Sequence, residues 1–192
     1  MTKSTKSNRR LTAIVTFIAG GIFLLGAAII PLLVNAQEKA LESAAPIIPP
    51  VTSNYLAPQL ALTNLDGTPS SLEDYRGQVI LVNNWATWCP PCKTEMPELQ
   101  AYYSAHSADG FVVVAIESGE PADEVVAFVN DYGLSFPVWL DLHDVALEAF
   151  QNWNLPSSYI IDRGGMVRLS WTGAIDRQTL EQYVTPLLEV KK

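Results

Sequence analysis

The residues of this chain most suited to chemistry are two cysteines. Cys89 and Cys92 are its only cysteines, and two prolines separate them within residues 85–92, Trp-Ala-Thr-Trp-Cys-Pro-Pro-Cys. Thiols at this spacing can close a disulfide within one turn of helix, and a disulfide so placed can reopen by exchange. We interpret the pair as a redox-active dithiol.

Two other interpretations of the cysteine pair are half of a zinc site and an inert structural disulfide. A zinc site needs four ligands, and the only histidines, His106 and His143, have no paired-ligand spacing. A structural disulfide that closes so short a loop removes little chain entropy from the unfolded state. We therefore expect no metal and no cofactor beyond the redox-active disulfide Cys89–Cys92.

The segments that flank the dithiol predict a junction between a strand and a helix. Residues 79–82 are aliphatic and uncharged, as in a buried strand, whereas residues 93–100 are helix formers apart from one proline. Cys89 then lies at a helix N-terminus, where free N–H groups and the helix dipole stabilise a thiolate. Pro90 and Pro91 have no N–H, so part of this stabilisation is absent. Their plainer interpretation is a favourable helix start.

A long uncharged stretch lies near the N-terminus. Residues 11–34 carry no formal charge and would extend about 36 Å as a helix, enough to cross a bilayer core of about 30 Å. Residues 1–10 hold four basic residues and no acidic one, and we expect this tail to stay in the cytoplasm. We favour a retained, single-pass signal-anchor in the cell membrane over a signal peptide cleaved after Ala36, because the stretch exceeds a usual signal h-region.

Both interpretations place the rest of the chain outside the cytoplasm. Residues 35–55 are rich in Ala and Pro and read as a tether, although residues 50–55 could instead be an extended arm that packs on the domain. Residues 56–192 remain as one domain, long enough to bury a hydrophobic core. The chain has 12 Lys and Arg against 20 Asp and Glu, and an acidic domain is a poor nucleic-acid binder.

Strand and helix signals alternate along this domain. Two continuous apolar runs separated by a helix predict a parallel βαβ unit, and a hairpin near the C-terminus predicts an antiparallel edge. The fold class is therefore α/β, with a central mixed sheet flanked by helices. We predict strands at 59–63, 79–85, 111–116, 136–140, 158–162 and 166–171, a helical turn at 72–75, and helices after Cys89, at 121–132, at 145–152 and at 176–190.

This order of elements resembles the thioredoxin fold. Its motifs resemble the membrane-anchored thiol-disulfide oxidoreductases of the TlpA/ResA type, which include the cytochrome c maturation thioredoxins. The resemblance covers about residues 56–190, and the section at 120–140 resembles the central helix-strand insertion of that family. The matching motifs are Asn-Asn-Trp-Ala-Thr-Trp-Cys-Pro-Pro-Cys-Lys-Thr-Glu-Met-Pro at 83–97, Tyr-Gly at 132–133, Phe-Pro-Val at 136–138 and Leu-Pro-Ser-Ser-Tyr-Ile-Ile-Asp at 155–162.

The resemblance implies catalytic roles for three residues. Cys89 is the nucleophile and Cys92 the resolving thiol, and we expect the Cys89 sulfur to face solvent and the Cys92 sulfur to be shielded. A glutamate at the position of Glu95 sits near the cysteines in that family and is implicated in proton handling, which thiol exchange requires. A solvated glutamate on a helix face is the plainer interpretation. Asn83 stands where ordinary thioredoxins have a buried aspartate, and its amide cannot titrate.

Four residues are expected to bind substrate: Trp88, Pro90, Leu155 and Pro156. In the resembling family a cis proline faces the cysteine pair, which implies a cis peptide bond before Pro156 and substrate docking on the Leu155 backbone. From the sequence alone, Pro156 would be an ordinary proline leading into a strand. Trp85 and Trp88 are expected to divide between core support and an exposed apolar rim for protein partners.

We therefore predict a membrane-tethered, extracytoplasmic thiol-disulfide oxidoreductase that reduces protein disulfides. The resemblance implies a membrane thiol carrier as electron donor and the haem-attachment cysteines of apocytochrome c as a client. A peroxiredoxin-like peroxidase is an alternative because the folds are related, but Thr87 stands two residues before Cys89 and no proline precedes the site nearby. A non-catalytic tethered module that binds haem or apocytochrome is another alternative.

Overall fold

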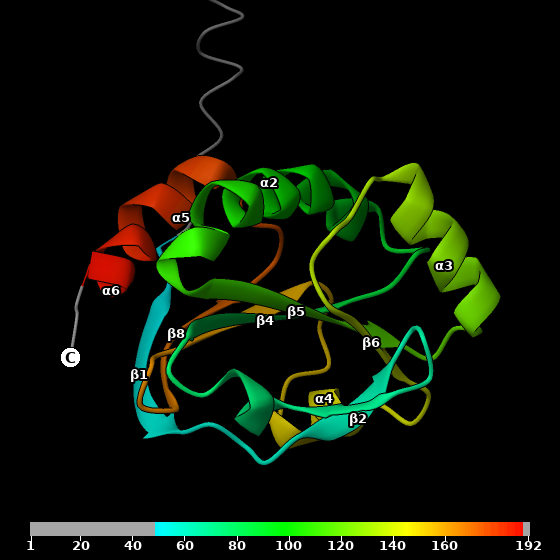
Figure 1. Cartoon of the computed structure of the whole chain (residues 1–192), viewed down its shortest axis with the longest axis horizontal. Helices are drawn as coiled ribbons and strands as arrows, with labels where there is room; N and C mark the ends of the chain where they lie inside the picture. The colour runs from blue at the N-terminus through cyan, green and yellow to red at the C-terminus, as the bar shows by residue number, and fades with distance from the viewer. Residues whose placement is uncertain (1–48, 190–192) are drawn as a thin grey trace, which may run out of the picture. The chain divides into compact units, whose positions relative to one another are not determined.

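The computed structural model describes residues 49–189, which form a sheet with helices on both faces (Figure 1). The α/β class and the thioredoxin-like arrangement predicted from the sequence are confirmed. The basic tail at 1–10, the expected membrane span at 11–34 and most of the expected tether lie outside the described residues. Within residues 49–189, no helix has the length and apolar character needed to cross a membrane.

The described strands form one mixed sheet of eight strands in the order β1-β8-β7-β4-β5-β6-β2-β3. β4, β5 and β6 are parallel, and every other neighbouring pair is antiparallel. The carboxyl ends of the three parallel strands therefore meet at one edge of the sheet. The strands are β1 Val51–Leu56, β2 Ala61–Asn64, β3 Pro69–Ser71, β4 Val79–Trp85, β5 Phe111–Ser118, β6 Val138–Asp141, β7 Ser157–Ile161 and β8 Met166–Thr172.

The helices divide between the two faces of the sheet (Figure 1). Four α-helices cover one face: α2 Pro90–His106, α3 Ala122–Asp131, α5 Arg177–Tyr183 and α6 Thr185–Glu189. The opposite face carries α4 Val145–Ala149 and the 3₁₀ turn η1 Leu72–Tyr75, and a second 3₁₀ turn, η2 Ser107–Asp109, follows α2. A sheet covered in this way buries side chains on both faces, which explains the continuous apolar runs of β4 and β5.

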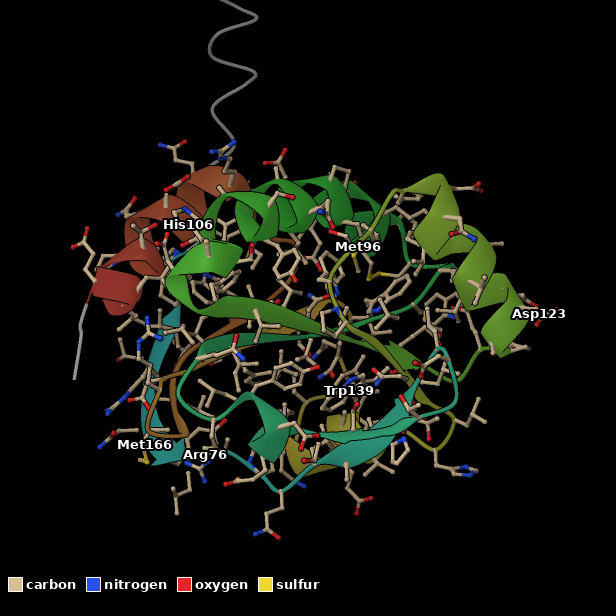
Figure 2. The ribbon with its side chains drawn as sticks, viewed as in Figure 1. Arg76, Met96, His106, Asp123, Trp139 and Met166 are labelled. Carbon is tan, nitrogen blue, oxygen red and sulfur yellow. A yellow bond between two sulfur atoms is a disulfide. The ribbon has the colours of Figure 1, made fainter. Side chains whose placement is uncertain are left out.

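Alternate residues of the central strand enter two separate cores. Leu81 points to the core under α2, α3 and α5, whereas Val82 points to the core on the α4 side. Figure 2 shows Met96 of α2 and Trp139 of β6 on opposite sides of the sheet, and both side chains are fully buried. The two cores fix the sheet between its helices and so fix the loops that leave the ends of the strands.

The first strand begins earlier than the expected domain start at residue 56. The sequence predicts residues 51–55 as the end of the tether, with an extended arm at 50–55 as the alternative, and these residues form β1 together with Leu56. β1 pairs antiparallel with β8, with Val51 opposite Ser170. Most side chains of β1 are exposed, so the sequence here lacks the apolar pattern by which a strand is recognised. Backbone hydrogen bonds to β8 at the edge of the sheet hold β1 in place.

The expected closing helix at 176–190 consists of two shorter helices, α5 and α6. Asp176 caps α5, because its side chain accepts a hydrogen bond from the Thr179 N–H at 2.7 Å. The break falls at Val184, two residues before Pro186. Proline has no N–H and its ring clashes with the carbonyl four residues earlier, which disfavours a continuous helix here, and Pro186 instead lies in the first turn of α6, where its missing N–H costs no hydrogen bond.

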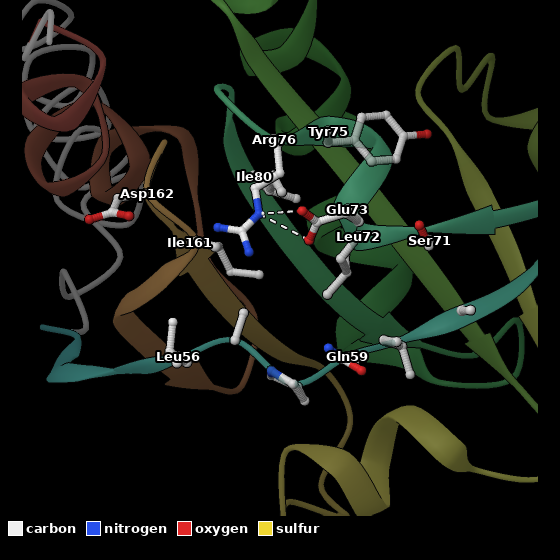
Figure 3. A pocket seen from close by; sticks show the side chains of 15 residues that line it. Leu56, Gln59, Ser71, Leu72, Glu73, Tyr75, Arg76, Ile80, Ile161 and Asp162 are labelled. Atoms are coloured by element: carbon white, nitrogen blue, oxygen red, sulfur yellow. Dashed lines mark hydrogen bonds and ion pairs between the residues drawn. The ribbon is translucent and has the colours of Figure 1, made fainter.

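The end of the sheet away from the dithiol has a hollow of about 610 Å³ (Figure 3). It lies between the segment that joins β1 to β2 and the turn η1, and Ile80 at the start of β4 lines it. Arg76 crosses its side in an ion pair with Glu73 at 3.0 Å. Because Cys89 follows the opposite end of β4, this hollow is separate from the dithiol.

Arg163, in the turn between β7 and β8, ties three segments together at this same end. Its guanidinium donates hydrogen bonds to the carbonyl oxygens of Gly77 at 2.9 Å, Asp109 at 2.9 Å and Leu188 at 3.3 Å. These carbonyls belong to the loops before β4 and β5 and to α6. One charged side chain therefore satisfies backbone acceptors from segments far apart in the sequence.

We predict that Arg163→Ala lowers the free energy of unfolding by about 2 kcal/mol, because charged hydrogen bonds to backbone acceptors are lost. Urea denaturation measures this change. Arg177→Ala is the matched control, because Arg177 makes only a solvent-exposed pair with Glu181 and should change the stability by about 0.5 kcal/mol or less. Equal effects of the two substitutions would contradict a role of Arg163 in tying the loops.

Candidate active site

The dithiol lies at the junction between β4 and α2, as predicted. β4 ends at Trp85, and Cys89 is the N-cap residue of α2, with an extended backbone at φ −85° and ψ 109°. Cys89 and Cys92 form a disulfide across the first turn of the helix, with their Cα atoms 5.3 Å apart. The described residues include no free cysteine.

The first turn of α2 offers one backbone N–H to the Cys89 sulfur. Pro90 and Pro91 occupy the first two helical positions and have no N–H. The next residue, Cys92, donates its N–H to Cys89 Sγ at 3.3 Å. The same contact would stabilise a Cys89 thiolate after reduction, because a helix N-terminus carries partial positive charge. The prolines therefore reduce the thiolate stabilisation expected at this position but do not abolish it.

Both cysteines are buried, although only Cys92 was predicted to be shielded from solvent. We expected the Cys89 sulfur to face solvent, but Cys89 is only 3 % exposed, and Cys92 is fully buried. The expectation for Cys89 is corrected by its surroundings: Pro90, Pro91, Trp88 and Leu155 line the same groove as Cys89 and limit its access to solvent. Cys89 is still the sulfur that borders the groove, whereas Cys92 does not line it.

Glu95 is a buried carboxyl group and not a solvated residue on a helix face. It is 1 % exposed, one turn along α2 from Cys92. Its Oε1 accepts a hydrogen bond from the Asn83 side-chain amide at 2.8 Å, and its Oε2 accepts one from the Ile175 N–H at 3.1 Å. Asn83, in the middle of β4, also donates to Ser158 Oγ of β7 at 2.9 Å.

This environment keeps Glu95 protonated at neutral pH. Burial raises the pKa of Glu95 from its ordinary value of 4.5 to about 8, although the hydrogen bonds from Asn83 and Ile175 oppose the rise. A carboxyl group with this pKa can donate a proton and take it back near neutral pH, as general acid–base chemistry requires. Asn83 cannot titrate, and its function here is to hold Glu95.

An open groove of about 520 Å³ leads to Cys89. Trp88, which is 64 % exposed, Pro90 and Leu155 line it, so three of the predicted substrate-binding residues meet at one surface. The fourth, Pro156, is buried next to Leu155, and the peptide bond between them is cis, as predicted. Trp85, in contrast, is fully buried and belongs to the core.

The structure adds residues that the sequence interpretation missed. Trp153, 64 % exposed, and Asp144 also line the groove. Glu120 accepts hydrogen bonds from Thr87, in the loop before Cys89. The sequence carried one usable signal: β5 ends in polar residues and Glu120 follows two positions later, and the carboxyl ends of parallel strands are where α/β sheets place their sites. Nothing in the local sequence singled out Trp153.

Comparison with known proteins identifies the relatives of this chain. Residues 54–170 match the model of the AhpC/TSA family. The chain is 36 % identical over 128 residues to the thiol-disulfide oxidoreductase ResA of Geobacillus kaustophilus, a match that covers 67 % of this chain and 74 % of that protein. It is 31 % identical to the ResA protein of Halalkalibacterium halodurans, over 67 % of this chain and 73 % of that protein.

Solved structures show the same arrangement. A putative thiol:disulfide interchange protein DsbE from Chlorobium tepidum superposes with a TM-score of 0.67 at 28 % identity, covering 72 % of this chain and 99 % of that chain. A putative thioredoxin from Neisseria meningitidis superposes with a TM-score of 0.64 at 30 % identity, covering 70 % of this chain and 91 % of that chain. The fold and the paired cysteines of this chain are thus those of thiol-disulfide oxidoreductases.

We predict that Glu95 supplies the proton that Cys92 takes up when the disulfide opens. The rate of reduction by a small dithiol, divided by the thiolate concentration of that reductant, should fall as the pH rises through about 8. Glu95→Gln should slow the reaction at pH 7 by about 10²-fold and abolish this fall. Stopped-flow fluorescence measures both.

Glu98→Gln, on the same helix, is the control and should keep the wild-type dependence of the reduction rate on pH.

Glu95→Gln should also change the dependence of the free energy of unfolding on pH. Because the pKa of Glu95 is raised in the fold, the unfolded chain loses this proton first, so the wild-type protein loses stability between about pH 4.5 and pH 8. Glu95→Gln removes that part of the loss. If the free energy of unfolding of Glu95→Gln depended on pH as that of the wild type does, Glu95 would not be the buried, protonated group described here.

Proposed function

Because the chain belongs to the AhpC/TSA family and is a thiol-disulfide oxidoreductase, we propose that it reduces protein disulfides through Cys89 and Cys92. The observation that carries the proposal is the disulfide at the start of α2, with its Cys89 side on an open groove and a buried, protonated Glu95 one turn behind Cys92. No other cofactor is needed, because the two sulfurs carry both electrons.

Recharging of the enzyme opens the disulfide. A thiolate of the electron donor attacks Cys89 Sγ, the bond between the two cysteine sulfurs breaks, and a mixed disulfide forms between the donor and Cys89. Cys92 leaves as a thiolate in a fully buried position, where an unpaired charge is unfavourable. Glu95 transfers its proton to this sulfur. The second thiol of the donor loses its proton to water and attacks the first donor sulfur, which closes the donor disulfide and releases Cys89 as a thiolate.

Reduction of the substrate oxidises Cys89 and Cys92 back to the disulfide. The Cys89 thiolate attacks one sulfur of the substrate disulfide, and the other substrate sulfur leaves and takes a proton from water. The Glu95 carboxylate then removes the proton from the Cys92 thiol, and Cys92 attacks Cys89 Sγ and releases the second substrate sulfur. Two electrons have passed to the substrate, the disulfide is closed again, and Glu95 is protonated as it was at the start.

We propose that the reaction takes place outside the cytoplasm, on a domain tethered to the cell membrane. The uncharged stretch at 11–34 and the basic residues before it support this location. A dithiol outside the cytoplasm is oxidised unless a donor recharges it, so a membrane thiol carrier is the proposed source of electrons. Tethering keeps the domain near such a carrier.

The proposed client is a protein whose cysteine pair must be reduced before use, such as the haem-attachment cysteines of apocytochrome c. An extended client segment would lie in the groove and pair with the Leu155 backbone. The exposed rings of Trp88 and Trp153 provide apolar contact area on the groove. Exposed aromatic residues gathered beside a reactive group are typical of a protein-binding surface.

We predict that the reduced full-length Cys92→Ala variant forms a stable mixed disulfide through Cys89. The probe is a peptide with an oxidised Cys-X-X-Cys-His segment, and mass spectrometry of the intact adduct measures the product. Without Cys92, the mixed disulfide cannot be resolved. Cys89→Ala is the control and should form almost no adduct, because Cys92 is fully buried.

Failure to trap this peptide, together with trapping of unrelated disulfide peptides, would contradict the proposed client but not the exchange chemistry. Failure with every disulfide peptide would contradict the reductase proposal itself.

We predict that Trp153→Ala raises the KM for a protein disulfide substrate about tenfold, as expected for loss of an aromatic contact at an interface. The rate with a small-molecule disulfide should not change, because such a substrate does not reach across the groove. Leu56→Ala is the matched control: Leu56 is 69 % exposed but lies at the other end of the sheet. Equal losses with protein and small substrates would contradict a binding role for Trp153.

A further inference from the structure

A carboxylate from another strand end holds the loop that carries the nucleophile. Glu120, which follows β5, is 9 % exposed. Its Oε2 accepts a hydrogen bond from the Thr87 N–H at 2.6 Å, and its Oε1 accepts one from the Thr87 hydroxyl group. Both oxygens of one carboxylate therefore bind a single residue that lies two positions before Cys89.

Thr87 occupies the turn that ends at the nucleophile. The Cys89 N–H donates to the Ala86 carbonyl oxygen at 3.2 Å and closes a four-residue turn in which Thr87 and Trp88 are the central residues. This turn is the whole connection between β4 and α2. A residue that fixes Thr87 therefore fixes the direction in which Cys89 enters the helix, and with it the contact from the Cys92 N–H to Cys89 Sγ.

Glu120 is itself held by a second acid. Its N–H donates to Glu117 Oε2 at 3.2 Å. Glu117 is fully buried in β5, where it lies opposite Trp85, the last residue of β4. Burial raises the pKa of Glu117 to about 8; the side chain of Glu120 and the charge of Asp141 add to the rise, whereas the hydrogen bond from the Glu120 N–H opposes it. Glu117 thus holds a proton at neutral pH.

The third acid of this edge has separate contacts. Asp141, at the end of β6, accepts hydrogen bonds from the N–H groups of His143, Val145 and Ala146, and so holds the loop into α4. Within residues 49–189, no group of three or more acids, histidines or cysteines is arranged to hold a metal ion. The carboxylates at this edge hold loops, and only Glu120 holds the loop of the dithiol.

We propose that Glu120 is a positioning residue for thiol-disulfide exchange. Its two hydrogen bonds to Thr87, here called the clamp, fix the turn so that Cys89 Sγ lies within reach of the Cys92 N–H and at the groove. The proposal rests on the exchange chemistry of the dithiol and is independent of the direction of electron flow and of the client. It differs from a purely structural role, in which loss of Glu120 would weaken folding but leave the reactivity of the folded protein unchanged.

The test compares Glu120→Gln and Thr87→Val with Thr87→Ser in the reduced full-length protein. Glu120→Gln replaces one acceptor oxygen by a donor, and Thr87→Val removes only the hydroxyl group. Thr87→Ser keeps both donors, and Glu124→Gln, an exposed residue of α3, is the matched control. The readouts are the pH midpoint of Cys89 alkylation by iodoacetamide, the rate of exchange with a small disulfide, and urea denaturation.

We expect Glu120→Gln and Thr87→Val to slow exchange at pH 7 about tenfold and to move the alkylation midpoint to higher pH. Thr87→Ser and Glu124→Gln should match the wild type, and the double variant should be no slower than the slower single variant, because both changes break one clamp. The direction of the midpoint shift is decisive. Loss of a nearby negative charge by itself would move it to lower pH, whereas a loosened turn moves it to higher pH.

A midpoint that falls or does not move in folded variants would overturn the proposal, as would strictly additive effects in the double variant. If Glu120→Gln does not fold, Thr87→Val decides alone, because it keeps the backbone contact and changes no charge. Wild-type exchange in folded Thr87→Val would then overturn the clamp.

Discussion

The hydrogen bond between the Asn83 amide and the Glu95 carboxyl group connects the central strand to the helix that begins at the dithiol, and the proton transfer that we propose for Glu95 depends on it. A carboxyl group in a core is unfavourable when charged, so this one stays protonated and needs hydrogen-bond partners. Asn83 and the Ile175 N–H supply them. The fold thereby holds a protonated carboxyl group one turn along α2 from the buried Cys92.

The carboxyl edge of the three parallel strands brings the rest of the site together. β4 leads into the dithiol, β5 into Glu120 and β6 into the loop that begins α4, and all three strands end on the same side of the sheet. Glu95 in α2 and Glu120 after β5 differ in their surroundings. Glu95 has two donors but is enclosed, and it holds a proton, whereas Glu120 lies at the edge and accepts two hydrogen bonds from Thr87.

Local sequence determines the parts of the site that could be predicted. The apolar run of β4 and the prolines after Cys89 predicted the strand and the helix start, whereas the cis peptide bond before Pro156 was predicted only through the resemblance to a known family. The burial of Cys89 and Glu95 and the clamp on Thr87 depend on contacts between distant segments. Glu95 and Ile175 are 80 residues apart, and Thr87 and Glu120 are 33 apart, so no local pattern reveals them.

The protonation state of Glu95 in the oxidised protein is the most direct test of this mechanism. The infrared absorption of its protonated carboxyl group, identified by difference from Glu95→Gln, can be followed from about pH 4 to about pH 10. We expect half of the band to remain near pH 8, because burial outweighs the two hydrogen bonds. A band lost with a midpoint near the ordinary value of 4.5 would mean that Glu95 is already charged at neutral pH and cannot supply the proton to Cys92.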